Sequence, residues 1–326
     1  MRPRRWSARS GEIARASTTW PLPRPAGAGA HTACRGRLGA GTVSLKYRLL
    51  LPLLTVMAAI MLYPIGFSLW LSLQDYRITR PDDAAFAGLD NYALILTDPS
   101  FGNALRNTLV FVFGAVTLEL ALGLGLALLV HRLRLLSGVV RSILLAPMFV
   151  TPIAVGLMFR FLLNAEIGVV SYHLGLAGVS VDWFGPKLAL FSLILIDVWQ
   201  WTPFMLLMFL AGLESLPRAP FEAARIDGAG AWLTFRALTL PLLMPVLVIA
   251  VIIRALDAFK VFEYVFAITR GGPGDATETL MYFIYQTGFR FFRMGEAAAA
   301  AIVVICLTMA LVVALVWAAR DGAKDR

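Results

Sequence analysis

The chain has 326 residues, of which 59% are hydrophobic and only 15% are charged. This composition is too apolar for a soluble domain and indicates a protein that crosses the membrane several times. The formal net charge of +9 would suggest a nucleic-acid partner for a soluble protein. Most of the excess lies beside apolar runs, so membrane topology explains it and no nucleic acid is expected.

The first 43 residues are rich in Arg, Ala, Pro and Gly and contain one acidic residue, Glu12. They hold no apolar run long enough for a signal peptide. Two interpretations stay open: residues 1–43 form a disordered basic tail, or translation begins near Val43, where the membrane-protein character starts. Residues 44–326 are expected to form one transmembrane domain.

Six apolar stretches each come near the ~20 residues that a membrane-spanning helix requires. Because the bilayer offers the backbone no hydrogen-bond partners, each stretch is predicted to be helical, which makes the fold all-α and polytopic. The stretches cover residues 48–72, 106–130, 140–163, 188–213, 242–268 and 297–319.

Positive charge is unevenly distributed between the two sides of these spans. Nineteen Lys and Arg residues lie in the terminal segments and in the loops that would share their side, whereas seven lie in the opposite loops. The cytoplasmic side of a membrane protein carries the excess of Lys and Arg. Both termini are therefore predicted to be cytoplasmic, and so is the polar loop at residues 214–241.

Small residues in the second span predict a close contact between helices. Ala121 with Gly125, and Gly123 with Ala127, have the spacing that lets a neighbouring helix approach closely. The alternative is that Gly and Ala are simply common in membrane helices. Glu119, in the same span, is an acid with no partner visible in the sequence; a pair with one of the basic residues in the fifth span stays open.

The fourth span contains the run DVWQWTPF, in which polar and aromatic residues precede a proline. Pro203 frees the carbonyl of Trp199, and a kink with a free acceptor offers a binding feature. Asp197 and Gln200 can bond hydroxyls, and an indole face can lie against a sugar ring. The alternative is that the proline shapes the bundle and the tryptophans pack. We adopt this second interpretation for Trp201, near neither a charge nor the freed carbonyl.

The fifth span contains four ionisable residues, Arg254, Asp257, Lys260 and Glu263, which alternate in sign at i,i+3 spacing. Residues three apart on a helix are neighbours, so adjacent members can form ion pairs. Charges in hydrocarbon are costly, so these residues are expected to face water, a partner subunit or a polar cavity. Two interpretations stay open: a translocation path, favoured for Asp257 and Lys260, or buried ion pairs that hold two subunits together.

Motifs for nucleotide hydrolysis and for metal binding do not occur. The sequence has no GxxxxGK[ST] phosphate loop and no HExxH pair. The histidines His31, His131 and His173 fall in separate segments, and Cys34 and Cys306 have no metal-ligand spacing. No metal, cofactor or nucleophile–base pair is therefore expected. Energy for transport would come from a partner or from an ion gradient.

The loop at residues 214–241 contains helix start and stop signals. Pro217 and Pro220 suit the beginning of a helix, and Gly228 or Gly230 suits its end. A short cytoplasmic helix is therefore predicted here, well placed to be pushed by a soluble partner.

The side chains of this predicted helix suit docking. Ala223 and Ala224 keep one side small enough for a groove of another protein to close over it. Polar contacts are expected from Glu222, Arg225 and Asp227. An amphipathic segment follows, with Trp232, Phe235 and Leu238 at i,i+3 spacing.

The same loop resembles the EAA signature of permease subunits of bacterial ATP-driven, binding-protein-dependent importers. The run EAA starts at Glu222, Gly228 follows after three residues, and nine more lead to LTLP, which ends at Pro241. Leu238 stands where the family usually has isoleucine. The resemblance implies that this helix is a coupling helix, which seats in a cleft of an ATPase. The implied coupling positions are Glu222, Ala223, Ala224, Asp227 and Gly228.

Further stretches resemble the carbohydrate-uptake branch, of maltose and glycerol-phosphate type. They lie at residues 47–76, 86–111, 197–204 and 262–285, and the resemblance covers roughly residues 45–320. It implies the fold of a type I importer permease in the bacterial inner membrane. It also implies three kinds of partner: a second homologous permease, a cytoplasmic ATPase dimer and an extracytoplasmic sugar-binding protein.

The leading hypothesis is a permease without an ATPase site of its own, which translocates a sugar or related polyol. The residues expected along the substrate path are Asp197, Trp199, Gln200, Asp257 and Lys260. The GGPG turn at residues 271–274 either meets the binding protein or is only a tight turn. The alternative function is an ion-coupled secondary transporter that uses the charges of the fifth span. A membrane-embedded enzyme is a more distant alternative.

Overall fold

The computed structural model describes residues 39–132 and 137–324. The chain divides into two compact units, Met1–Met61 and Leu62–Arg326. In the described part of the first unit, residues 39–61 form the beginning of helix α1 (Gly39–Ser72). The predicted basic tail lies outside the described residues, except for the five that begin α1.

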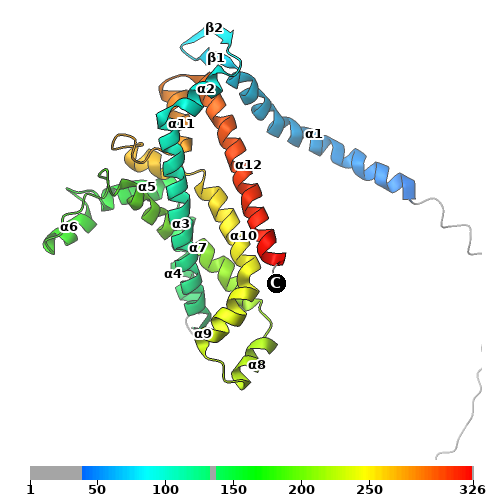
Figure 1. The fold of residues 1–326 in the computed structure, drawn as a ribbon, viewed down its shortest axis with the longest axis vertical. Coiled ribbons are helices and arrows are strands. Elements are labelled where there is room, and N and C mark those ends of the chain that lie inside the picture. The colour runs from blue at the N-terminus through cyan, green and yellow to red at the C-terminus, as the bar shows by residue number, and fades with distance from the viewer. Residues whose placement is uncertain (1–38, 133–136, 325–326) are drawn as a thin grey trace, which may run out of the picture. The chain divides into compact units, whose positions relative to one another are not determined.

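The second unit contains four further long apolar helices (Figure 1). α3 packs along α7, and α10 packs against α3, α7 and α12. Buried apolar side chains of α3, α7 and α10 form the core between them. These helices are α3 (Pro99–Arg132), α7 (Ala189–Glu214), α10 (Leu240–Ala258) and α12 (Met294–Lys324).

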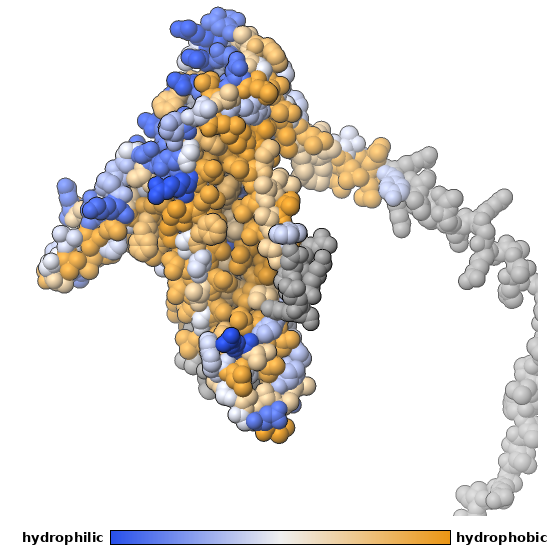
Figure 2. All heavy atoms as spheres, viewed as in Figure 1, coloured by the Kyte–Doolittle hydropathy of each residue, from blue (hydrophilic) through white to orange (hydrophobic). Residues whose placement is uncertain are grey.

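Hydrophobic side chains cover much of the second unit, while hydrophilic ones gather over β1 and β2 (Figure 2). An outward-facing apolar surface suits contact with lipid. Among the described residues, five helices are long and apolar enough to cross a membrane: Leu49–Ser72, Pro99–His131, Ala189–Glu214, Ala231–Ala258 and Met294–Ala318. A sixth span is present if a bent helix pair is counted as one.

The third predicted span is this bent pair. Its parts Ser142–Phe149 and Pro152–Leu162 meet at 101°, so the prediction of one helix over residues 140–163 is wrong. The cause is Pro152, because proline disfavours helical geometry in the residue before it, and Thr151 is indeed extended. The elements here are α4 (Ser137–Leu145), the 3-10 helix η1 (Ala146–Phe149) and α5 (Pro152–Leu162).

The fifth predicted span also ends early. α10 stops at Ala258 instead of continuing to residue 268, so the prediction of one helix over 242–268 is wrong. The chain resumes helical geometry at Glu263 and continues into the π-helix η3 (Val265–Thr269). Between them, the carbonyl of Val261 accepts a hydrogen bond from the hydroxyl of Thr279, so the break leaves this buried acceptor satisfied.

The short elements lie mainly in the loops. Strands β1 and β2 form an antiparallel hairpin in which Gln74 pairs with Phe86 and Arg77 with Arg80. The side-chain amide of Asn91 ties this hairpin to the end of α1, because it donates to the carbonyls of Ser72 and Gln74, both at 2.9 Å. The elements are β1 (Gln74–Arg77), β2 (Arg80–Phe86), α2 (Asp90–Thr97), α6 (Val169–Leu176), α11 (Leu280–Tyr285) and the π-helix η4 (Gln286–Arg290).

The small residues of α3 make the predicted close contact, but with one of the two pairs only. A Cβ added to Gly123 would lie 2.5 Å from Cβ of Met205, so α3 and α7 touch there. Ala127 is buried on the same face. Ala121 and Gly125 lie on the exposed side, where an added Cβ at Gly125 would meet nothing within 4 Å.

Candidate functional site

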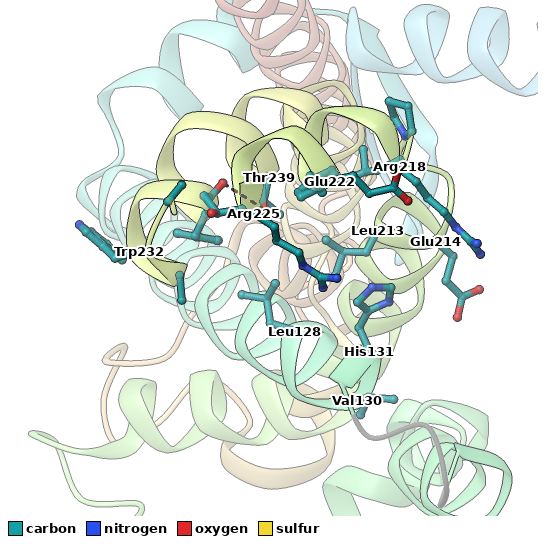
Figure 3. Close-up of a pocket in the computed structure, with 17 residues that line it drawn as sticks. Leu128, Val130, His131, Leu213, Glu214, Arg218, Glu222, Arg225, Trp232 and Thr239 are labelled. Atoms are coloured by element: carbon teal, nitrogen blue, oxygen red, sulfur yellow. Dashed lines mark hydrogen bonds between the residues drawn. The ribbon is translucent and has the colours of Figure 1, made fainter. Parts of the chain in front are cut away.

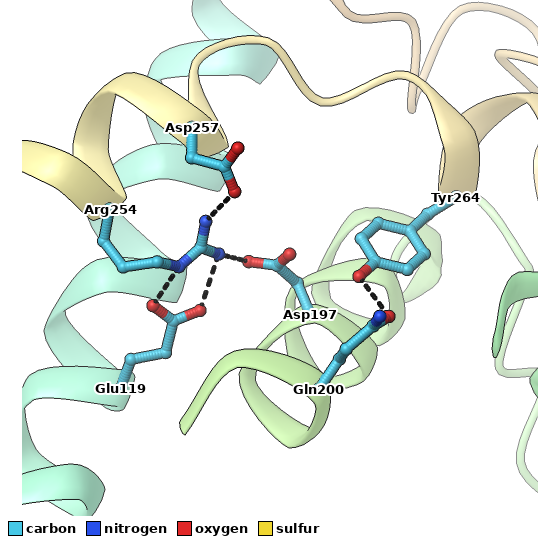
Figure 4. A network of polar contacts seen from close by, with 6 residues as sticks. All are labelled: Glu119, Asp197, Gln200, Arg254, Asp257 and Tyr264. Atoms are coloured by element: carbon cyan, nitrogen blue, oxygen red, sulfur yellow. Dashed lines mark hydrogen bonds and ion pairs between the residues drawn. The ribbon is translucent and has the colours of Figure 1, made fainter. Parts of the chain in front are cut away.

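Arg254 of α10 is surrounded by three carboxylates from three helices (Figure 4). Its Nε and Nη2 donate to the two oxygens of Glu119 at 2.7 and 2.8 Å. Nη2 also donates to Asp197 of α7, and Nη1 donates to Asp257 at 2.7 Å. We call these four residues the Arg254 cluster; it joins α3, α7 and α10.

Burial makes this cluster energetically costly unless all its members stay paired. Glu119 is 0%, Arg254 1% and Asp197 2% exposed. Removing ions from water costs several kcal/mol each, and only well-placed charge-assisted hydrogen bonds offset that cost. The bidentate Arg254–Glu119 pair has this geometry. Loss of any one buried member would therefore leave another buried charge unpaired.

Trp201 belongs to the surroundings of the cluster. The guanidinium carbon of Arg254 lies 5.1 Å from the centroid of its ring, within range of a cation–π interaction. The prediction that Trp201 lies near no charge is therefore wrong. Trp201 follows Asp197 by four residues, so both lie on one face of α7, and Asp197 already faces Arg254.

The alternating charges of the fifth span form only their first predicted pair. Arg254 and Asp257 pair as expected, but α10 ends at Ala258, so Lys260 and Glu263 leave the helical register. Among residues 39–132 and 137–324, Lys260 forms no ion pair with Asp257 or with Glu263. The side chain of Asp257 is 51% exposed, and Lys260 and Glu263 are exposed as well.

Gln200 lies fully buried beside the cluster, on α7 (Figure 4). Its Nε2 donates to the carbonyl of Val150 at 2.7 Å, and its Oε1 accepts from the hydroxyl of Tyr264 at 2.6 Å. The neighbouring Trp199 is exposed, and its ring forms a T-shaped pair with that of Phe159, with 5.2 Å between centroids.

The structure divides the five predicted path residues into two groups. Asp197 and Gln200 are buried, and both make hydrogen bonds inside the chain. Trp199, Asp257 and Lys260 are exposed. Only the second group presents side chains to a molecule that passes along the surface of this chain.

The predicted docking helix is α8 (Ala219–Ile226), with Pro220 in its first turn. Gly228, not Gly230, ends it: its φ is +72°, a left-handed conformation that favours glycine. The amide of Ala229 donates to the carbonyl of Ala224 at 2.9 Å, which closes the helix end.

Most residues of α8 are exposed. Among the predicted coupling positions, Glu222, Ala223, Asp227 and Gly228 are exposed, whereas Ala224 is partly buried. Ile226 is 87% exposed, although the sequence pattern predicted no role for it. The available signal in the sequence was a large apolar residue, Ile226, between the charged residues Arg225 and Asp227.

A short amphipathic stretch links α8 to α10. It consists of α9 (Ala231–Thr234) and the π-helix η2 (Phe235–Thr239). Trp232 is 72% exposed, and its ring lies 5.7 Å from that of Phe235. α9, η2 and α10 run on as one candidate span, Ala231–Ala258, which begins five residues after α8 ends.

A cavity of about 1280 Å³ separates α8 and α9 from the ends of α3 and α7 (Figure 3). Arg225 extends from α8 into this cavity toward His131 of α3. The polar side chains around it include Glu214, Arg218 and Glu222. The inner side of α8 thus faces an open space that α3 and α7 border as well.

The GGPG turn connects η3 to α11 and is held against α3. Gly271 and Gly274 have φ values of +84° and +65°, which explains the glycines. The amides of Asn103 and Asn107 donate to the carbonyl of Asp275 at 2.8 and 3.1 Å. The turn is therefore anchored, as the tight-turn interpretation expects, and its contact with a binding protein stays a prediction.

Glu278, at the end of this loop, is a buried acid. Burial raises the pKa of its carboxyl to about 7, and the nearby charges of Asp275 and Asp98 add to the effect. Asn107 fixes the backbone beside it through a bond to the carbonyl of Glu278 at 3.0 Å.

Comparison with known proteins places these features in context. The family model described as "binding-protein-dependent transport system inner membrane component" matches residues 119–320. A probable ABC transporter permease protein of Sinorhizobium fredii is 38% identical over 276 residues, which is 84% of this chain and 89% of the relative. The trehalose/maltose transport system permease protein MalF of Thermococcus litoralis is 38% identical over 254 residues, 77% of this chain and 84% of the relative.

A solved structure has the same fold. It is the crystal structure of a bacterial ABC transporter involved in the import of the acidic polysaccharide alginate. The match has a TM-score of 0.74 at 23% identity and covers 86% of this chain and 96% of the other. The predicted all-α permease fold is therefore confirmed.

Proposed function

The chain belongs to the family of binding-protein-dependent transport system inner membrane components, and we propose that it translocates a sugar or related polyol as the permease subunit of an ATP-driven importer. The printed functions of its relatives support the substrate class, since MalF of Thermococcus litoralis serves trehalose and maltose transport. In this proposal both termini and α8 face the cytoplasm, as the distribution of Lys and Arg favours.

The observation that carries the proposal is the exposure of helix α8 in the loop before α10. A short polar helix is exposed, closed at Gly228 and placed in the loop before α10. A cytoplasmic ATPase dimer that docks on this exposed helix would cover its apolar side chain Ile226, which is 87% exposed. The contact positions are the predicted ones, Glu222, Ala223, Ala224, Asp227 and Gly228. ATP hydrolysis then belongs to that partner.

The continuous stretch from α9 to α10 is the path by which the ATPase acts on the membrane. When the ATPase closes, it displaces α8, and α9, η2 and α10 follow, because they form one candidate span. The far end of α10 carries Arg254 and Asp257. The displacement thus reaches the Arg254 cluster and changes the exposure of Asp257.

The substrate path runs along the exposed polar groups at that end of α10. The carboxylate of Asp257 and the ammonium of Lys260 can bond hydroxyls, while the indole of Trp199 can lie against the apolar face of a sugar ring. Asp197 and Gln200 stand behind these residues and hold their positions.

A second, homologous permease completes this path. Exposed charges at the end of a membrane span are costly beside lipid, so Asp257, Lys260 and Glu263 need polar surroundings. A second permease chain opposite them encloses a polar passage. An extracytoplasmic sugar-binding protein delivers the substrate at the GGPG side of the molecule.

The test is uptake of labelled sugar into proteoliposomes that contain the whole importer. We expect uptake that requires ATP on the ATPase side and does not change when an ionophore removes ion gradients. Uptake abolished by the ionophore but independent of ATP would contradict the proposal and favour an ion-coupled secondary transporter.

A further inference from the structure

We propose that Gln200 is a positioning residue that holds the bend of the third span against the segment following α10. The inference rests on the proposed function, because it assigns a role in transport to a residue behind the path. It concerns three parts of the chain: the break between η1 and α5, the middle of α7, and the segment from Tyr264 to Thr269.

The break in the third span leaves the carbonyl of Val150 outside the regular helical pattern. Val150 is extended, with ψ of 137°, and so is Thr151, with ψ of 138°. Nε2 of Gln200 donates to this carbonyl at 2.7 Å. A carbonyl at membrane depth needs a partner, and here a side chain of another span supplies it.

The other end of the same amide binds the segment after α10. Oε1 of Gln200 accepts from the hydroxyl of Tyr264 at 2.6 Å. Gln200 is 0% exposed and Tyr264 is 2% exposed. One buried amide therefore links three segments that are distant in the sequence, and its two ends are engaged on the protein rather than toward the surface.

Two further contacts hold α5 to the same segment. Nη1 of Arg160 donates to the carbonyl of Ala267 at 3.1 Å. A Cβ added to Gly156 would lie 3.0 Å from Cβ of Ala267, so the two backbones run close together. These contacts secure α5 near its middle and end, and Gln200 secures its beginning at the bend.

Gln200 is also connected along the chain to two exposed residues of the proposed path. Trp199 is its neighbour on α7 and rests on Phe159 of α5. Tyr264 follows Lys260 by four residues. Loss of the Gln200 bonds would therefore shift both Trp199 and Lys260 without removing a group that touches the sugar. The expected result is less efficient transport with an unchanged preference among sugars.

The experiment compares three variants in the complete importer reconstituted in proteoliposomes. Gln200→Leu removes both hydrogen bonds at similar volume, and Tyr264→Phe removes only the second. Thr202→Val is the matched control, because the buried hydroxyl of Thr202 has no hydrogen-bond partner among the described residues. We expect uptake to fall about tenfold in the first variant and about threefold in the second, and to be unchanged in the control.

Two readouts separate positioning from sugar contact. The first is the ratio of ATP hydrolysed to sugar moved, which we expect to rise in Gln200→Leu while the order of preference among several sugars stays the same. The second is the distance between spin labels at Ile143 on α4 and Phe161 on α5, in a chain whose Cys34 and Cys306 are replaced by serine. We expect this distance distribution to broaden in Gln200→Leu and not in Thr202→Val.

Wild-type transport by Gln200→Leu, or a changed sugar preference with an unchanged label distance, would overturn the inference. If Gln200→Leu does not assemble, Tyr264→Phe decides: a broadened distance supports the positioning role, and an unchanged distance contradicts it. The label distance does not depend on transport. A wild-type importer without ATP-driven uptake would therefore refute the proposed function while the bend could still be tested.

Discussion

The Arg254 cluster and helix α8 hold polar residues under opposite conditions. In the cluster, Glu119, Asp197 and Arg254 are almost fully buried, and each is paired with another member. In α8, the polar coupling positions Glu222 and Asp227 are exposed to solvent. One candidate span, Ala231–Ala258, separates them: α8 precedes its first residue, and Arg254 and Asp257 lie near its last.

The difference shows where each group finds its partner. The buried residues are satisfied within the chain, so their removal is expected to damage folding. The exposed residues of α8 contribute little to the fold, so their removal is expected to damage an association instead. Half-exposed Asp257 lies between these extremes, because one side of it pairs with Arg254 and the other is open.

The largest effect on folding is expected from Arg254→Met. This change leaves two buried carboxylates without their cation and should cost about 3–5 kcal/mol of unfolding free energy. Thermal unfolding of the purified chain in detergent measures it. Exposed Arg290→Ala is the control and should cost less than about 0.5 kcal/mol. A wild-type melting temperature for Arg254→Met would show that the cluster does not stabilise the bundle.

The largest effect on uptake without a loss of folding is expected from changes in α8. Glu222→Lys and Gly228→Asp should reach the membrane in normal amounts but lose most ATP-driven uptake and retain less ATPase in a pull-down. Gly230→Asp, two residues beyond Gly228, is the control for Gly228→Asp. Normal uptake together with normal retention of the ATPase would remove α8 from the coupling role.

A smaller effect is expected from Asp257→Asn. The exposed side of this residue limits its contribution to stability, which should change by about 1 kcal/mol or less. Uptake should fall about tenfold, since a charge-assisted bond to a sugar hydroxyl is weakened. Glu263→Gln, also exposed but beyond the Arg254 pair, serves as the control. If Asp257→Asn unfolds the chain without affecting uptake per folded molecule, Asp257 is a structural member of the cluster.

The last expected effect depends on pH and concerns Glu278, which is buried with no cation paired to it among the described residues. Its pKa is about 7, above the ordinary 4.5 of a glutamate, so the folded state retains a proton that the unfolded state has lost. Unfolding free energy should therefore decrease as the pH rises from about 5 to about 8. Melting curves over this range test it. Glu278→Gln should flatten the dependence, and an identical pH profile for both proteins would contradict the assignment.

Local spacing in the sequence predicted the features that depend on neighbours along the chain. The helix end, predicted at Gly228 or Gly230 and found at Gly228, and the Arg254–Asp257 pair both follow from residues only a few positions apart. Local spacing could not identify which basic residue pairs with Glu119. Arg254 lies 135 residues further along, and only the packing of α10 against α3 brings the two together.

The errors in the predicted spans have a different origin. Hydropathy averaged over about 20 residues does not register a break that a few residues cause. Pro152 was a visible signal for the bend in the third span. The early end of α10 at Ala258 had no such signal, because the residues after it are still largely apolar. The bond that satisfies the carbonyl of Val261 comes from Thr279, which is distant in the sequence.

The central claim is that α8 is the contact with a cytoplasmic ATPase. Site-specific photo-crosslinking in the assembled importer tests it most directly, with the crosslinker at exposed Ala223 and, as control, at exposed Asp83 in β2. We predict a product with the ATPase from position 223 and none from position 83. A product from position 83, or none from position 223 in an importer that hydrolyses ATP, would contradict the account.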